Sequence, residues 1–202
     1  MLFRSIKRDG SYEPMLFDKV TKRIQDLCSS LEVQADKVAQ KVFVSMYDGI
    51  KTSEIDDLSA DVAVHMLTDH PDYETLATRI VVSNMHKNSP KCFSDAMLEL
   101  YTLNRVSKEF MKCVLLELDS EIVHERDYDF SYFGLKTLQK MYLGPGETPQ
   151  YMYMRVAVGI HGSDIERVKE TYHLMSQHYF TDRKSTRLNS SHVSESRMPS
   201  SA

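Results

Sequence analysis

The chain has 202 residues, of which 42% are hydrophobic and 27% are charged, and its formal net charge is −4. This acidic balance disfavours nucleic acid as the main partner, because nucleic-acid-binding domains are usually strongly basic. It has no run of about 18 apolar residues that would predict a membrane-spanning helix. Its three cysteines (Cys28, Cys92 and Cys113) lie far apart without a CxxC pair, which favours reduced thiols of a cytosolic protein over disulfides or a zinc site.

The chain opens with a pattern typical of a β-hairpin. Residues 2–6 form a short strand candidate, Asp9-Gly10 is a pair favoured in tight turns, and residues 11–15 return antiparallel to the first strand. Apolar residues then recur every three or four positions between residues 17 and 31, which predicts a helix.

Three more helices are predicted before residue 90. An apolar stripe over residues 38–46 stops at Gly49, and the next helix follows Ser53 as its predicted N-cap. Pro71 separates that helix from the fourth, because proline is tolerated at a helix start and not inside a helix. The predicted fold is therefore mainly α, with a small β-hairpin cap on a four-helix bundle of about ninety residues.

The later part of the chain predicts further helices over residues 91–101, 106–118 and 165–179. Residues 128–133 are rich in aromatic side chains, which are predicted to be buried because aromatics usually fill cores. Three histidines lack the spacing of metal ligands to cysteines or carboxylates, so neither a metal site nor a catalytic group is assigned; they are His161, His173 and His178.

Polar residues of the first ninety cluster at the ends of predicted elements. The helix start at residues 17–19 offers free backbone N–H groups and a positive dipole end, which suit an anion. Nearby cations can neutralise phosphates, and a carboxylate such as Asp56 can accept hydrogen bonds from ribose hydroxyls. These features predict a nucleotide pocket without a glycine-rich loop. The alternative, which composition alone favours, is that the charged residues only cap and solvate helix ends.

Particular motifs resemble those of a known family. Residues 6–10 (IKRDG), Glu13 and residues 17–20 (FDKV) resemble the opening of an ATP-cone domain. Residues 49–56 (GIKTSEID) and 70–87, which contain HPDY and ATRIVVSNMHK, are similar to its later signatures. More narrowly, the chain resembles the large subunit of class I ribonucleotide reductase of the eukaryotic type.

The resemblance implies an allosteric site that distinguishes ATP from dATP, with magnesium, and sets overall activity. Basic residues would hold the phosphates, and Asp18 with the surrounding backbone would address the base. It also implies a cytoplasmic parent that works with a radical-generating small subunit and other large subunits, without nucleic acid, membrane or a covalently bound cofactor. Carried over by position, the ATP-binding residues are Lys7, Arg8, Glu13, Pro14, Met15, Leu16, Phe17, Asp18, Lys19, Thr52, Asp56 and Lys87.

The resemblance continues beyond the cone. Residues 126–138 (RDYDFSYFGLKTL) and 149–161 (PQYMYMRVAVGIH) are similar to stretches at the start of the family's catalytic portion. The implied organisation is an ATP-cone over residues 1–90 and an incomplete N-terminal helical part of the catalytic domain over residues 91–181. Residues 101–126 match least and are shorter than expected, either as a lineage difference or as an assembly fault.

The chain departs from the family after Thr181. Residues 182–202 (DRKSTRLNSSHVSESRMPSSA) are rich in serine and too poor in apolar residues to offset their ordering entropy, which predicts disorder. They also resemble the translation of a sequencing adapter, so we expect an artefact. The resemblance places the catalytic cysteines beyond this point. The fragment itself is then not catalytic, whereas its parent reduces ribonucleoside diphosphates.

Two other functions remain open. A free-standing cone that acts as a nucleotide-sensing regulator is one, although such regulators carry a zinc ribbon and this chain has no CxxC motif. A helical interaction module whose charged ends merely cap helices is the other. Binding of ATP or dATP would separate the nucleotide-sensing functions from the interaction module.

Overall fold

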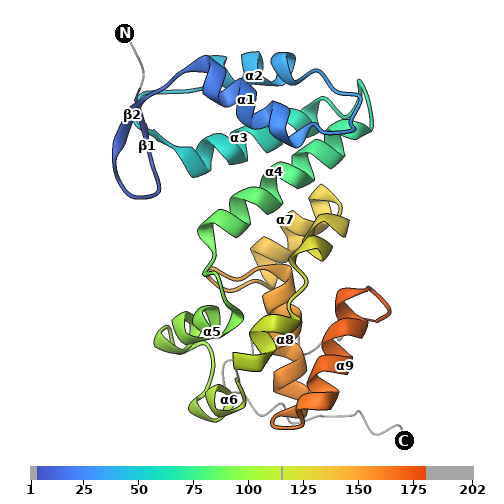
Figure 1. Ribbon diagram of the computed structural model, residues 1–202. Helices are drawn as coiled ribbons and strands as arrows, with labels where there is room; N and C mark the ends of the chain where they lie inside the picture. Colours follow the sequence, from blue (N-terminus) through green and yellow to red (C-terminus); the bar gives the residue numbers. More distant parts are fainter. Residues whose placement is uncertain (1–3, 115, 181–202) are drawn as a thin grey trace, which may run out of the picture. The chain divides into compact units, whose positions relative to one another are not determined.

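The chain folds into two compact units, seen in a computed structural model that describes residues 4–114 and 116–180 (Figure 1). The first unit combines the described part of residues 1–89 with residues 125–138, and the second combines residues 90–124 with the described part of residues 139–202. The predicted tail lies outside the described residues. The predicted domain boundary at residue 90 stays a prediction.

A small sheet closes one end of the first unit. Strand β1 (Arg4–Ile6) pairs antiparallel with β2 (Tyr12–Pro14), as the predicted hairpin requires, and Gly10 in the turn has a φ of 82°. A third strand, β3 (Ile50–Lys51), lies parallel to β1 on its other side. The sequence pattern does not predict β3, because a strand of two residues carries no measurable alternation.

Four helices form the body of the first unit, as predicted. Neighbouring helices pack in chain order, and α3 and α4 run side by side (Figure 1). Apolar side chains from three of the helices are almost fully buried between them, including Ile24, Val42, Leu76 and Ile80. The helices are α1 (Phe17–Leu27), α2 (Ala35–Val44), α3 (Thr52–His65) and α4 (Asp72–Asn88).

The start of α3 differs from the predicted start. The N-cap prediction at Ser53 is wrong, because the helix already begins at Thr52 and the Glu54 carboxylate accepts a hydrogen bond from the Lys51 N–H at 3.3 Å. The reason is tertiary: pairing with β1 keeps the chain extended as far as Lys51, and the helix starts directly after it. This places Thr52 at the edge of the sheet.

Residues 125–138 complete the first unit with most of the 3-10 helix η2 (His124–Asp129) and of helix α7 (Tyr132–Met141). Tyr132 is buried, and its hydroxyl donates a hydrogen bond to the Asp61 carboxylate at 2.5 Å. Burial, followed by this hydrogen bond, raises the pKa of Tyr132 well above its usual value.

The predicted burial of the aromatic stretch is wrong for two of its residues. Tyr128 is 42% exposed and Phe133 is 58% exposed, whereas Tyr132 is 6% exposed. The stretch runs from the end of η2 to the first turn of α7, so consecutive side chains point in different directions. One side chain therefore enters the core while its neighbours remain on the surface.

The secondary structure described in the second unit consists of α-helices and 3-10 helices. The predicted helix over residues 106–118 is wrong, because α6 ends at Cys113 and a separate 3-10 helix follows. Asp119 explains the break: its carboxylate accepts hydrogen bonds from the backbone and the hydroxyl of Ser94, which ties η1 to α5. The elements are α5 (Phe93–Thr102), α6 (Lys108–Cys113), η1 (Leu116–Glu121), α8 (Pro149–His161) and α9 (Ile165–Ser176).

Helix α8 is the centre of the second unit. It packs against α9, and all its residues from Pro149 to Val158 are buried. Arg155 is among them, and its guanidinium pairs with the Glu147 carboxylate at 2.6 Å. Within the described residues, no helix combines the length and the apolar character that crossing a bilayer requires.

Candidate functional site

Two adjoining cavities lie at the sheet end of the first unit. The larger, of about 530 Å³, is lined by the hairpin, the β3–α3 junction and the C-terminal end of α4. The smaller, of about 180 Å³, is lined by β2, α1 and α3, together with single residues of β1 and α4. Arg8, Thr52 and Lys87 line both cavities and thus form their common wall.

The structure gathers most of the predicted site residues around these cavities. Phe17 and Asp18 are the exceptions, because neither residue lines either of the two cavities. Phe17 instead packs edge-to-face against Phe43 with ring centroids 5.6 Å apart, and Asp18 is exposed. Their assignment to the site stays a prediction without a supporting contact. Lys7 lines the larger cavity; Glu13, Pro14, Met15, Leu16, Lys19 and Asp56 line the smaller; and Arg8, Thr52 and Lys87 line both.

Glu13 is paired with two lysines on the hairpin side of the site. The Lys7 ammonium lies 2.8 Å from its carboxylate, and Lys19, from the first turn of α1, forms a second ion pair with it. Hydrogen bonds from Lys19 and then from Lys7 lower the pKa of Glu13. The hydrogen bond with Glu13 raises the pKa of Lys7 in turn. Lys7 is therefore charged at neutral pH.

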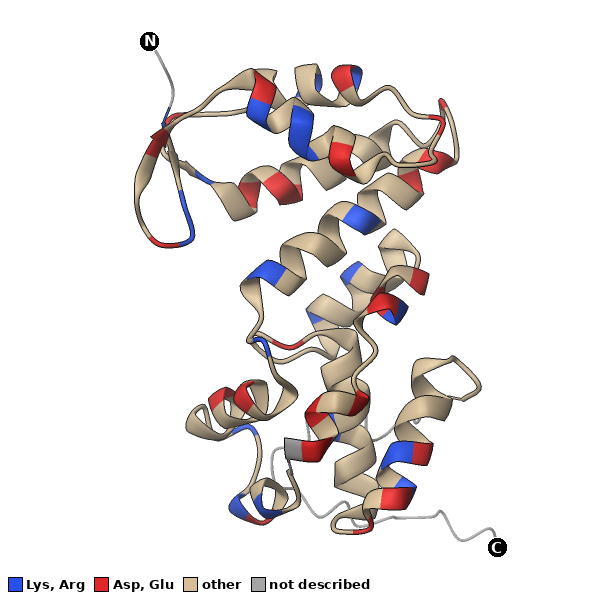
Figure 2. Ribbon diagram, viewed as in Figure 1, with Lys and Arg blue, Asp and Glu red and all other residues tan. Residues whose placement is uncertain are grey.

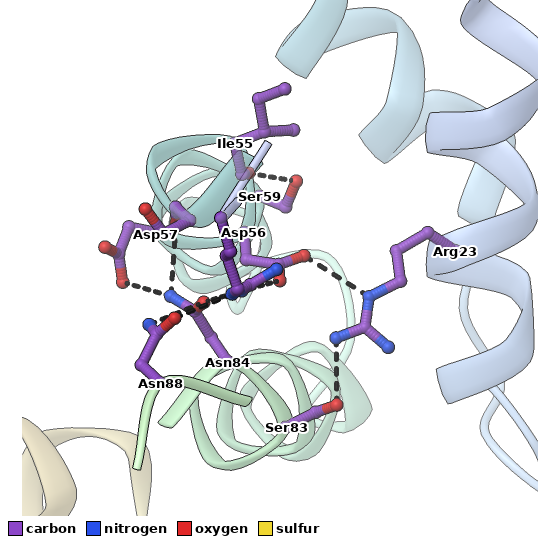
Figure 3. A network of polar contacts seen from close by, with 10 residues as sticks. Arg23, Ile55, Asp56, Asp57, Ser59, Ser83, Asn84 and Asn88 are labelled. Carbon is purple, nitrogen blue, oxygen red and sulfur yellow. Dashed lines mark hydrogen bonds and ion pairs between the residues drawn. The ribbon is translucent and has the colours of Figure 1, made fainter. Parts of the chain in front are cut away.

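A buried carboxylate lies between two arginines on the helix side of the site. Asp56 projects from α3, and one of its oxygens accepts a hydrogen bond from Arg23 at 3.3 Å (Figure 3). Its other oxygen accepts a hydrogen bond from Arg8 at 3.4 Å. Arg8 also donates to the side-chain oxygens of Asn84 at 2.6 Å and Asn88 at 2.7 Å. These contacts link the hairpin to α3 and α4.

Positive charge exceeds negative charge around the cavities. Much of the Lys87 side chain is exposed, yet partial burial of its amino group, followed by repulsion from Arg23 and Arg8, lowers its pKa. Figure 2 shows basic segments on the hairpin, on α1 and near the C-terminal end of α4. This local surplus in an acidic chain suits a polyanion. The lining cations are Lys7, Arg8, Lys19, Arg23, Lys51 and Lys87, against the carboxylates of Glu13 and Asp56.

The structure adds residues that the sequence reasoning missed. Arg23 lines the smaller cavity, Lys51 lines the larger, and Asn84 receives the Arg8 guanidinium. One signal was present, because Lys19 and Arg23 are four residues apart and such residues share one helix face. Nothing in the sequence indicated that Asn84 belongs to the site, because a polar residue within a long helix looks like an ordinary surface residue until the packing is known.

Comparisons with known proteins match both parts of the chain. Residues 4–88 match the ATP cone domain family. Residues 128–182 match the family described as the ribonucleotide reductase all-alpha domain. The first match spans both cavities, and the second covers α7, α8 and α9.

The chain is also similar to curated proteins over almost its whole length. It is 43% identical to the ribonucleoside-diphosphate reductase large chain of Schizosaccharomyces pombe, over 91% of this chain and 25% of that protein. It is 44% identical to large chain 2 of Saccharomyces cerevisiae and 43% identical to the large subunit of Arabidopsis thaliana, again over 91% of this chain. The chain spans about a quarter of the length of these relatives.

Proposed function

Since the chain belongs with the N-terminal regions of ribonucleoside-diphosphate reductase large subunits, we propose that its first unit is an allosteric site for ATP and dATP. The observation that carries this proposal is the surplus of cations around two adjoining cavities within the region that matches an ATP cone. A triphosphate supplies the negative charge that these side chains can neutralise.

The two cavities suit different parts of a nucleotide. The larger cavity is lined by Lys7, Arg8, Lys51 and Lys87, which we propose hold the phosphates. The smaller cavity includes apolar side chains that suit the flat face of a base. In place of Asp18, we propose that the base lies against the residues Pro14, Met15, Leu16, Val20 and Ile55.

Asp56 lies within the lining of the smaller cavity and can accept hydrogen bonds from ribose hydroxyls. Its oxygens are already oriented by two arginines, so the acceptor is in place before a nucleotide enters. ATP and dATP differ only at the 2′-hydroxyl, so a ribose-facing carboxylate is the group best suited to distinguish them.

The names of the similar proteins support a proposal for the function of the whole protein. We propose that the parent is an oxidoreductase of the cytoplasm that reduces ribonucleoside diphosphates, and that ATP or dATP with magnesium sets its activity. Its partners are then the small subunit and other large subunits. In this proposal, the described part of the chain supplies the effector site and the first helices of the catalytic region.

Titration of the full 202-residue chain with ATP, dATP and adenosine tests the proposal. With magnesium present, both nucleotides are expected to release or absorb heat saturably and to raise the melting temperature, because a ligand that binds only the folded state stabilises it by mass action. Adenosine lacks the phosphates and is expected to cause neither effect at equal concentration. Absence of both effects at millimolar ATP and dATP would favour the helical interaction module.

The affinity for ATP is expected to fall at alkaline pH as Lys87 loses its proton. Its pKa is already below the ordinary value of 10.5 in the free chain, so this loss begins at a lower pH than for an ordinary lysine. The stability of the fold changes with pH in the opposite direction to the affinity for ATP. Between the lowered pKa of Lys87 in the folded chain and its ordinary pKa in the unfolded chain, the unfolded chain binds more protons, so the contribution of Lys87 to stability rises with pH.

Calorimetry with ATP from about pH 8 upwards measures this effect, because the phosphates of ATP are then fully ionised. Bound phosphates are expected to raise the pKa of Lys87, so ATP binding takes up protons from the buffer. The number of protons is obtained by comparing the heat of binding in two buffers that have different ionisation enthalpies. Lys87→Gln is expected to reduce both the pH dependence and the proton uptake. An unchanged pH dependence in this variant would assign the titration to another group.

A further inference from the structure

Arg23 connects three helices at the wall of the smaller cavity. It projects from α1, its Nε donates to Oδ1 of Asp56 on α3 at 3.3 Å, and its Nη2 donates to the Ser83 hydroxyl on α4 at 2.8 Å (Figure 3). The side chain is half-buried and lines the cavity. Two hydrogen bonds from different atoms of one planar group fix both its position and its orientation.

Arg8 holds the other oxygen of the same carboxylate in a different way. Its Nη2 lies 3.4 Å from Oδ2 of Asp56, and the same nitrogen donates a shorter hydrogen bond of 2.6 Å to Asn84. Arg8 comes from the hairpin turn region and lines both cavities, so its guanidinium is within reach of a phosphate placed in the larger one. Its contact with Asp56 is thus the one that a bound phosphate can replace.

We propose that Arg23 is a positioning residue that holds Asp56 ready to accept a hydrogen bond from the ribose of the bound nucleotide. The inference rests on the proposed function and deepens it, because it names the group that sets the discrimination between ATP and dATP. When the phosphates attract Arg8, Arg23 keeps Oδ1 of Asp56 occupied and leaves Oδ2 facing the ligand. Ser83 prevents the Arg23 guanidinium from following the phosphates, because it anchors the second nitrogen.

Two simpler roles of Arg23 make different predictions. If Arg23 contributes only positive charge, its removal weakens ATP and dATP equally, since the two carry the same phosphates. If it only ties the helices together, its removal lowers the melting temperature and leaves the ratio of the two dissociation constants unchanged. A positioning role alone alters that ratio.

The test compares Arg23→Gln with Lys22→Gln in the full chain. Lys22 is the preceding residue of α1, is exposed and lines neither cavity, so its replacement removes the same charge without touching Asp56. Calorimetry gives the dissociation constants for ATP and dATP, and thermal unfolding gives the melting temperature. Arg23→Gln is expected to move the ratio of the two constants towards one by about threefold to tenfold, which corresponds to losing part of one charged hydrogen bond.

Two milder variants keep the inference testable if Arg23→Gln folds poorly. Arg23→Lys keeps the charge and loses the planar two-point contact, so it is expected to shift the ratio while retaining most of the overall affinity. Ser83→Ala removes only the second anchor and is expected to shift the ratio in the same direction by less. An unaltered ratio in all three variants, or an equal shift in Lys22→Gln, would overturn the positioning role. Failure of the unmodified chain to bind either nucleotide would instead overturn the proposed function.

Discussion

Replacing Arg8 by glutamine is expected to weaken ATP binding by about 10- to 100-fold. Hydrogen bonds to charged groups are each worth about 1.5–3 kcal/mol, and about 1.4 kcal/mol corresponds to a factor of ten in affinity. Arg8 is the arginine that lines both cavities, so its removal takes away one of the two cations, with Lys87, at their junction. Isothermal titration of the full chain with ATP and magnesium measures the change directly.

Arg4→Gln is the matched control for this variant. Arg4 lies in β1 of the same hairpin, is exposed and lines neither cavity, so its replacement makes the same change in net charge. Its effect on ATP binding is expected to be less than about threefold, because exposed charges at a distance are screened by salt. Equal weakening by Arg4→Gln and Arg8→Gln would show that only the overall charge of the hairpin matters.

The loss of Arg8 also removes contacts within the protein. Arg8 donates to Asp56, Asn84 and Asn88, so the melting temperature of Arg8→Gln has to be measured alongside its affinity. Asp56 retains its ion pair with Arg23 in this variant, and it is therefore not left as an unpaired buried charge. We expect the variant to remain folded at 25 °C and the loss of affinity to be a direct effect.

Arg155→Met is expected to destabilise the second unit by about 3–5 kcal/mol. The side chain of Glu147 is 0% exposed, and its carboxylate accepts hydrogen bonds from Arg155 at 2.6 and 3.2 Å and from the Gly144 N–H at 2.8 Å. Removing one partner of a buried ion pair leaves an uncompensated charge, which typically costs this much. Urea unfolding combined with hydrogen exchange of the α8 amides assigns the change to this unit.

The double variant Arg155→Met with Glu147→Gln is expected to regain much of the lost stability, because neither partner is then charged. Arg167→Met provides an exposed comparison: Arg167 pairs with Asp164 on the surface of α9, with 71% of its side chain exposed. A surface pair of this kind contributes about 0–1 kcal/mol. Similar effects of Arg155→Met and Arg167→Met would mean that burial does not govern the strength of the Arg155 pair.

Local pattern predicted those parts of the fold in which neighbours along the chain decide the structure. The Asp9-Gly10 turn, the apolar period of α1 and the proline before α4 each act within a few residues, and the structure confirms the elements that they predict. Predictions failed where a distant partner intervened. Asp119 interrupts the helical pattern of residues 106–118 by binding Ser94, and pairing with β1 moves the start of α3 to Thr52.

The candidate site shows the same difference between residues in local motifs and residues whose place depends on distant contacts. The resemblance to the ATP cone assigned ten of the residues that line the cavities, and the motifs that carry it lie at a hairpin turn and at helix starts, which are local features. The same resemblance assigned Phe17 and Asp18 to the site, yet the helical turn directs Phe17 towards Phe43 and leaves Asp18 exposed. Arg23, Lys51 and Asn84 were not assigned to the site from the sequence, although Arg23 shares a helix face with Lys19.

The sequence by itself determined the order of elements, the acidic balance of the chain and the basic residues at the ends of the cone's elements. These follow from turn propensity, apolar period and charge, which are properties of short segments. Only the tertiary structure decided that Asp56 faces Arg8 and Arg23, and that Ser83 anchors the second of them. Residues 23, 56 and 83 lie on three different helices, and their meeting depends on how those helices pack, which depends on the whole buried core rather than on any one segment.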